Sequence, residues 1–442
     1  MTGCVQRMRA NPSNAGALKM PITELGYGHS SIKFAYDADR FEVLAPIEDT
    51  SHPLSDVEIG EAFDAPVDSP ALDDVIAAGD RVLMVVSDAT RATGSARIIN
   101  LLVRRLIQNG IQPGEVAVIF ATGIHRAVRP QEKAELLTPF IAQRIHTIDH
   151  DAYDSKRLIQ IGVMESGTSI DVNRALRDFN KVILTGGVGF HYFAGFSGGR
   201  KSICPGLAAA HTIEATHILA LDFERGERRA GVGAGLLEGN VVNEACERVA
   251  GMIDPVFSIN AIVDDRGRVE RVFAGHWQKA HRRACEDYVV GHALEIREKR
   301  DVVVVSAGGS PYDINLIQAH KALDMAAHAC VDGGTIILLA ECVDGLGRTD
   351  FLKWFESADS RGLGTRLRKA YEVNGQTAWS LLTKTERWRI RIVTELADEE
   401  VRRMRMIPAP SIEEAVSNIP ADATGYIMPR GAAFLPVVSE SS

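Results

Sequence analysis

Short apolar runs alternate with amphipathic stretches along most of the chain, and this alternation predicts strands and helices in turn. The run at 81–86 is almost wholly apolar, and similar runs lie at 115–120 and 181–185. Continuous apolar strands are typical of parallel sheets, whose two faces are both covered. An amphipathic stretch at 95–108, closed by an Asn-Gly pair, predicts a helix between the first two strands. The pattern therefore predicts a doubly wound α/β domain.

The same rhythm begins again in the second half of the chain. Apolar runs predict three strands there, at 301–305, 335–340 and 388–393. A helical stretch at about 276–300 predicts a connector between the two halves. We expect two doubly wound α/β domains with parallel-type sheets and an active-site cleft between them. A polar leader at 1–20, expected to be disordered, precedes an N-terminal cofactor-binding domain at 21–290 and a smaller C-terminal domain at 291–442.

The composition mainly excludes classes of partner and of site. The 442 residues carry a formal net charge of −9, so the chain lacks the positive surface that binds nucleic acids and anionic membranes. No stretch reaches the roughly 20 apolar residues of a membrane span, and the N-terminus lacks an apolar signal segment. Six cysteines are scattered without a CxxC motif, which argues against a zinc cluster or a disulfide framework. We therefore expect a cytoplasmic enzyme with a small-molecule partner and no nucleic-acid or membrane partner.

Polar loops follow three of the predicted strands, and parallel topology brings such loops to one edge of a sheet. Asp88 and Arg91 follow the first strand and could bind a ribose hydroxyl and an anion, or serve as a helix cap and a surface cation. His125 follows the second strand and His191 the third. Each could act as a general acid or base, because imidazole titrates near neutrality, or be a structural histidine. Two such histidines could flank a substrate from opposite sides, as a racemase requires.

A glycine-rich segment at 186–201 carries the most distinctive chemistry of the chain. It places Lys201 close to Gly198 and Gly199, and His217 follows 16 residues after the lysine. The spacing is not that of a P-loop, because an arginine separates the glycines from the lysine, and this disfavours a nucleotide triphosphatase. A lysine offers a covalent amine and a histidine a metal ligand, although His217 could also be a core residue. A single histidine holds a metal only if another group completes the coordination sphere, so the segment points to an organic cofactor that is both tethered and metal-bound.

The second domain contributes one candidate helix face. Gln318 and Lys321 lie one helical turn apart and follow a Gly-Gly-Ser-Pro loop. They could reach across the cleft to a substrate carboxylate or carbonyl, or form a solvent-facing stripe. Asp313 is expected to cap their helix.

In their order and spacing, these segments resemble the nickel-pincer lactate racemase family. The resemblance covers roughly residues 25–430 and rests on Asp88-Ala-Thr-Arg91, Ile124-His-Arg126, Gly189-Phe-His191, Gly195-Phe-Ser-Gly-Gly-Arg-Lys-Ser-Ile-Cys-Pro-Gly206, Thr216-His217 and Pro311-Tyr-Asp-Ile-Asn-Leu-Ile-Gln318 through Lys321. It implies a two-domain α/β enzyme that carries the nickel-pincer nucleotide, nickel pyridinium-3,5-bisthiocarboxylic acid mononucleotide. It also implies dependence on the enzymes that make this cofactor.

The resemblance implies a role for each candidate residue. The implied cofactor contacts are Lys201 as a covalent thioamide tether, His217 as the nickel ligand, Gly198 and Gly199 beside the flat ring, and Asp88 and Thr90 at the nucleotide. The implied substrate contacts are Arg91, Gln318 and Lys321, which would hold a carboxylate. His125 and His191 would alternate as base and acid on the 2-hydroxyl, while the hydrogen on C2 leaves as hydride to the cofactor and returns to either face. The implied activity is that of a racemase or epimerase of a 2-hydroxy acid.

The chain departs from the family pattern near its predicted substrate site. Ile317 stands where lactate-specific members have a tyrosine, so we expect a substrate other than, or broader than, lactate. His320 lies in the same segment, and helical geometry turns it away from the substrate-binding face. Trp354 and Trp379 are both candidates for the pocket tryptophan of the family.

Two other interpretations stay open at this point. One is a lyase or dehydratase of hydroxy acids that uses the same site without returning the hydride. The other is a non-catalytic carrier of the cofactor, which would need Lys201 and His217 but not His125 and His191. The sequence also leaves the number of subunits open, a homo-oligomer included.

Overall fold

The computed structural model describes residues 20–45, 52–89, 91–264 and 266–439. The predicted leader therefore lies outside the described residues, apart from Met20. Among the helices that the structure describes, none is long and apolar enough to cross a membrane.

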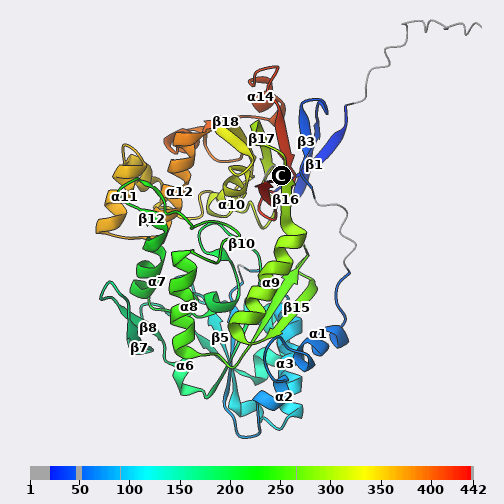
Figure 1. Cartoon of the computed structure of the whole chain (residues 1–442), viewed down its shortest axis with the longest axis vertical. Helices are drawn as coiled ribbons and strands as arrows, with labels where there is room; N and C mark the ends of the chain where they lie inside the picture. Colours follow the sequence, from blue (N-terminus) through cyan, green and yellow to red (C-terminus); the bar gives the residue numbers. More distant parts are fainter. Residues whose placement is uncertain (1–19, 46–51, 90, 265, 440–442) are drawn as a thin grey trace, which may run out of the picture.

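A six-stranded sheet forms the centre of the N-terminal domain, in the lower half of Figure 1. Its order is β15 (Val269–Gly275), β14 (Phe257–Val263), β9 (Lys181–Gly187), β4 (Val82–Ser87), β5 (Val116–Ala121) and β6 (His146–Asp149). All neighbours pair in parallel except β14 and β15, which are antiparallel. The three apolar runs of the first half of the sequence are β4, β5 and β9, so the predicted doubly wound α/β fold is confirmed.

Helices cover both faces of this sheet. They are α1 (Asp56–Asp64), α2 (Leu72–Val75), α3 (Ser95–Gln108), α4 (Pro130–Leu137), α5 (Pro139–Arg144), α6 (Ala175–Asp178), α7 (Ala210–His217), α8 (Val241–Ile253) and α9 (Trp277–His292). The helix predicted at 95–108 is α3, whose buried positions recur every three to four residues and face the sheet. Short two-stranded ribbons complete the domain: β7 (Leu158–Val163) with β8 (Ser169–Asn173), β10 (Phe190–His191) with β11 (Gly195–Phe196), and β12 (Leu221–Asp222) with β13 (Glu227–Arg228).

The C-terminal domain has its own six-stranded sheet, and every neighbouring pair in it is parallel. Its order is β20 (Ile407–Pro408), β19 (Arg389–Val393), β18 (Cys330–Leu339), β17 (Arg300–Ser306), β21 (Gly425–Met428) and β3 (Phe41–Val43). Its helices are α10 (Leu316–Ala326), α11 (Ser360–Lys369), α12 (Val373–Arg387), α13 (Asp398–Arg403) and α14 (Ile412–Ser417). The second doubly wound domain is therefore also present.

The first strands of the chain depart from the predicted domain boundary, which assigned 21–290 to the N-terminal domain. Strand β3 pairs with β21, and the hairpin of β1 (Ile22–Tyr27) and β2 (Ser30–Ala35) packs beside it. Leu25, Phe34 and Phe41 are buried in one cluster with the inward-facing residues of the C-terminal sheet. A short strand shows the same alternation whichever sheet it joins, so its partner is decided by tertiary packing.

The connector between the domains also differs from the prediction of one long helix at 276–300. Helix α9 ends at His292, and the chain continues as β16 (Ala293–Ile296), which pairs with β22 (Leu435–Val438) near the C-terminus. The end of the chain is thus tied back to the connector.

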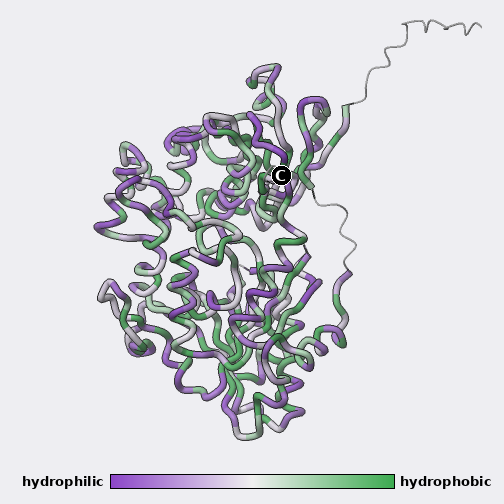
Figure 2. The backbone as a smooth tube through the Cα atoms, viewed as in Figure 1, coloured by the Kyte–Doolittle hydropathy of each residue, from purple (hydrophilic) through white to green (hydrophobic). Residues whose placement is uncertain are grey.

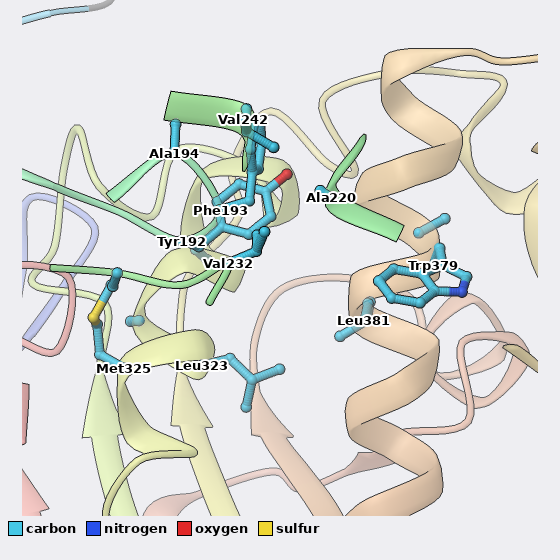
Figure 3. Close-up of a cluster of buried hydrophobic side chains, with 14 of the residues drawn as sticks. Tyr192, Phe193, Ala194, Ala220, Val232, Val242, Leu323, Met325, Trp379 and Leu381 are labelled. Atoms are coloured by element: carbon cyan, nitrogen blue, oxygen red, sulfur yellow. The ribbon is translucent and has the colours of Figure 1, made fainter. Parts of the chain in front are cut away.

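One apolar core runs through both domains. A single buried cluster contains side chains of the N-terminal sheet, such as Leu83, and of the C-terminal sheet, such as Val303. Figure 2 shows apolar residues concentrated along the central strands and polar residues on the outer helices. Figure 3 shows Tyr192 and Phe193 of the N-terminal domain in the same buried cluster as Leu323 of α10 and Trp379 of α12. The two sheets are therefore held together by apolar packing next to the glycine-rich segment.

Candidate active site

The candidate residues of the N-terminal domain gather where its sheet reverses its strand order. Strand β4 lies between β5 and β9, so the loops that leave β4 and β9 turn to opposite sides and open a crevice. Asp88 and Arg91 follow β4, His125 follows β5, and the glycine-rich segment follows β9. Strand β17 has the same position in the C-terminal sheet, and its loop leads into α10. Figure 1 shows β10 and α10 between the two sheets.

His125 and Asp88 form a hydrogen-bonded pair. Nδ1 of His125 lies 2.7 Å from Oδ2 of Asp88. The carboxylate is buried, whereas 53% of the His125 side chain is exposed. A carboxylate at Nδ1 favours the tautomer whose Nε2 can accept a proton, and it stabilises the imidazolium that then forms. The sequence predicted a nucleotide contact for Asp88 and did not foresee this contact with His125.

Two buried polar side chains, Arg200 and His281, pack against the glycine-rich segment. Gly198 and Gly199 have φ angles of +77° and +52°, which favour glycine. A Cβ on Gly199 would lie 2.5 Å from the ring of His281. Arg200 is 1% exposed. Its Nη2 donates a hydrogen bond of 2.6 Å to the carbonyl oxygen of Ala194, and its Nη1 lies 3.2 Å from Nε2 of His281. These contacts fix the backbone from which Lys201 projects.

The ring of Phe193 brings three of the predicted site residues together. Nζ of Lys201 lies 5.4 Å from its centre. The ring centres of His217 and His191 lie 5.0 and 4.6 Å away. His191 also stacks on Tyr192 at 5.3 Å. An amine and two imidazoles therefore share one aromatic wall.

Burial favours the neutral forms of these three groups. It lowers the pKa of the Lys201 amine well below its usual range, and the charge of Arg200 lowers it further. Burial lowers the pKa of His217 to about 3 and that of His191 well below its usual range, and Lys201 contributes to both shifts. A neutral amine is a nucleophile, and a neutral imidazole can bind a metal or accept a proton.

Lys321 completes the site from the C-terminal domain. Its Nζ donates a hydrogen bond of 2.6 Å to Oε1 of Gln318. Burial lowers the pKa of Lys321 to about 7, Arg91 lowers it as well, and Asp88 raises it. The charges of Arg91 and Lys321 also lower the pKa of His191. Charged groups of the two domains therefore lie close enough to shift one another's pKa values.

The structure corrects one predicted cap and leaves one predicted residue undescribed. Asn315, rather than Asp313, caps α10, because its Oδ1 accepts a hydrogen bond of 3.0 Å from the backbone N–H of Gln318. Asp313 instead accepts a hydrogen bond of 2.7 Å from the backbone N–H of Gly28. Thr90, predicted at the cofactor nucleotide, lies outside the described residues.

The remaining candidates lie behind the cleft. His320 is 2% exposed and packs edge-on against Tyr192, with 4.9 Å between the ring centres. Trp354 lies within the C-terminal domain, with the guanidinium of Arg366 4.2 Å from its ring centre. Both tryptophans belong to the buried cluster that spans the two domains, and Figure 3 shows Trp379 on α12.

Two features of the site were not predicted from the sequence: the aromatic rings of Tyr192 and Phe193, and a buried charge. Tyr192 and Phe193 directly follow His191, and this run of rings after a glycine-rich turn was the available signal. Asp324 is 2% exposed and lies one helical turn after Lys321. A carboxylate within an apolar helix segment was the signal for that residue.

The described residues contain no group of three or more histidine, cysteine, aspartate or glutamate side chains arranged to hold a metal ion. A metal at His217 would therefore need donors from another bound group.

Comparisons with known proteins agree with this architecture and with the motifs. Sequence models of the lactate racemase N-terminal domain and of the lactate racemase C-terminal domain match residues 27–228 and 296–425. The lactate racemase of Thermoanaerobacterium thermosaccharolyticum is 29% identical over 434 aligned positions, and the alignment covers 94% of this chain and 99% of that protein. The lactate racemase of Lactiplantibacillus plantarum is 28% identical over 336 residues, 75% of this chain and 77% of that one.

Solved structures with a similar fold include two proteins of the same architecture. The lactate racemase apoprotein of Thermoanaerobacterium thermosaccharolyticum superposes with a TM-score of 0.86 at 28% identity, covering 94% of this chain and all of that one. A protein from Thermotoga maritima shares the fold, with a TM-score of 0.66 at 19% identity over 88% of this chain and 99% of that one. Since both domain models match in order and the relatives align along most of the chain, this chain belongs to the lactate racemase family.

Proposed function

We propose that the protein is a racemase or epimerase of a 2-hydroxy acid that uses a lysine-tethered nickel-pincer nucleotide. The observation that carries this proposal is the arrangement around Phe193. There, a desolvated lysine amine and two desolvated imidazoles lie within 5.4 Å of the centre of one aromatic ring. Family membership supports the racemase class, and the chemistry of the side chains supports the cofactor.

The residues present fit the proposed cofactor. The Lys201 amine has no carboxylate within ion-pair distance among the described residues, and its lowered pKa suits covalent attachment. His217 has its Nδ1 3.2 Å from the hydroxyl of Thr216, which leaves Nε2 as the nitrogen for nickel. Gly198 and Gly199 have positive φ angles, so they give the backbone before Lys201 a conformation that other residues rarely adopt. When bound, the cofactor would supply the acceptor that takes the C2 hydrogen of the substrate as hydride and returns it.

The two catalytic histidines would move the proton of the 2-hydroxyl. His125 would accept this proton at Nε2, since Asp88 holds its Nδ1. His191 is neutral in its desolvated position and would perform the same task for the other enantiomer. Each histidine would later return its proton to the 2-oxygen. Two bases on different loops allow both stereoisomers to react.

The cations of the cleft would hold the substrate carboxylate. Arg91 and Lys321 approach from opposite domains, and Gln318 orients the ammonium of Lys321. Ile317 has no hydroxyl to offer, so we propose a 2-hydroxy acid other than, or broader than, lactate. We also propose a cytoplasmic location and dependence on the enzymes that synthesise the cofactor.

The first test is the intact mass and nickel content of the protein produced together with cofactor-making enzymes, beside its Lys201→Ala variant. We expect a covalent adduct with about one nickel per chain in the parent and no adduct in the variant. The loaded parent is then incubated with single enantiomers of 2-hydroxy acids, and the product is resolved by chiral chromatography. Interconversion of two stereoisomers supports the proposal. A parent without adduct overturns the cofactor assignment, and net formation of a dehydrated product would identify a lyase instead.

A further inference from the structure

A buried ionic cluster lies directly behind the candidate active site. Oδ1 of Asp324, on α10, lies 2.6 Å from Nη2 of Arg228 and 2.7 Å from Nζ of Lys384. Lys384, on α12, also donates a hydrogen bond of 2.8 Å to Oγ of Ser380. The side chains of Asp324 and Lys384 are 2% and 5% exposed. The cluster thus joins the β12–β13 ribbon of the N-terminal domain to two helices of the C-terminal domain.

The carboxylate of Asp324 is ionised in this cluster. Burial opposes its ionisation, but the charges of Arg228 and Lys384 outweigh burial and hold its pKa below the usual range. Replacing a buried ion pair by apolar residues is often neutral or stabilising, so such a cluster is weak evidence for a purely stabilising role. What it does fix is geometry, because charge-assisted hydrogen bonds constrain both direction and distance.

Two short chains of contact lead from this cluster to the site. On one side, the Arg228 guanidinium lies 5.7 Å from the ring centre of Tyr192, and Tyr192 stacks on His191 at 5.3 Å. On the other side, Asp324 lies one helical turn after Lys321 on α10. The cluster therefore contacts both the support of a proposed base and the helix of a proposed carboxylate ligand.

We propose that Asp324 is a positioning residue for the reaction. By binding Arg228 of one domain and Lys384 of the other, it sets the position of Lys321 relative to His191. This inference rests on the proposed function for its catalytic meaning, but the positioning itself does not. No catalytic contact of Asp324 with substrate is implied.

The matched pair of variants is Asp324→Asn and Asp332→Asn. Asp332 also pairs with an arginine of the C-terminal domain, Arg387 at 2.8 Å, but it is 65% exposed and away from the cleft. In enzyme loaded with cofactor, we expect Asp324→Asn to lower kcat/KM by about 10- to 100-fold, because small displacements of reacting groups have effects of this size. Adduct mass and nickel content should stay at the parent level, since Lys201 and His217 are held within the N-terminal domain. Asp332→Asn should leave kcat and KM within about twofold, as expected for an exposed pair.

A distance measurement tests the positioning without any catalysis. Spin labels are placed at Tyr153→Cys in the N-terminal domain and Val343→Cys in the C-terminal domain, whose side chains are exposed, in a Cys4→Ser background. The five described natural cysteines are buried and should not be labelled. We expect Asp324→Asn to broaden or shift the interdomain distance distribution, and Asp332→Asn to leave it unchanged.

The outcomes separate the two proposals. A parent that racemises no 2-hydroxy acid refutes the proposed function, while the distance measurement still decides the positioning. A folded Asp324→Asn protein with parent-like kcat/KM and parent-like distances refutes the positioning role. If Asp324→Asn does not fold, Arg228→Lys replaces it, because it keeps the charge and loses the planar guanidinium. That variant is then expected to show the same distance change and a smaller loss of kcat/KM, and parent-like values in both refute the role.

Discussion

The pKa of Lys321 gives the sharpest quantitative expectation. Burial lowers it from 10.5 to about 7, with Arg91 adding to the effect. Below pH 7 the ammonium is present and can bind a substrate carboxylate, and above pH 7 it is lost. With a pKa of about 7, the protonated fraction falls from roughly 90% at pH 6 to roughly 1% at pH 9. A binding step that needs the ammonium should therefore weaken by roughly 90-fold over this range.

The assay is the pH profile of kcat/KM for the parent and for Lys321→Arg, which stays charged at every pH used. The ratio of the two profiles cancels those titrations that do not depend on the charge at position 321. We expect kcat/KM of the parent, divided by that of Lys321→Arg, to fall steeply above pH 7. Parallel profiles from pH 6 to 9 would refute the assignment of Lys321 to the carboxylate.

A second measurement checks the same pKa without cofactor or substrate. In the unfolded chain a lysine titrates near pH 10.4, so between about pH 7 and 10 the unfolded chain binds more protons than the folded one. The free energy of unfolding should therefore rise with pH in this window, by at most about 1.4 kcal/mol per pH unit. Urea unfolding of the parent and of Lys321→Met measures the difference, and a difference that stays constant with pH contradicts the lowered pKa.

Three further predictions concern the glycine-rich segment and its neighbours. His217→Ala should keep the covalent adduct but lose nickel, as measured by intact mass and metal analysis, and full nickel retention would exclude it as the ligand. His125→Ala and His191→Ala should each slow interconversion in both directions by at least about 100-fold while still carrying cofactor, and a near-parent rate in either would end the two-base scheme. Gly199→Ala should lower the free energy of unfolding by about 1–3 kcal/mol, because of its positive φ and the 2.5 Å approach to a histidine ring. Gly60→Ala is the control, since a Cβ there meets nothing within 4 Å, and equal losses in both variants would argue against this cause.

Local pattern was a good guide to the elements that carry the site. The apolar runs at 81–86, 115–120 and 181–185 became β4, β5 and β9, because a strand buried on both faces must be apolar throughout. The loops after these strands held most of the candidate residues, since parallel strands end at one edge. The local sequence pattern could not predict which side chains contact one another. Nothing in the spacing of Asp88 and His125 shows that their side chains meet at 2.7 Å.

Periodicity and turn chemistry are local properties, so the fold class, the two doubly wound domains and the residue types at the strand ends could be predicted from the chain alone. The ordered motifs that place the chain in its family are also local. Three features came from folding: β3 joins the C-terminal sheet, the ring of Phe193 lies near the amine and the imidazoles, and Asp324 joins the two domains. These features depend on which distant segments pack together. Burial then sets the charge state of each group, and burial exists only in the folded chain.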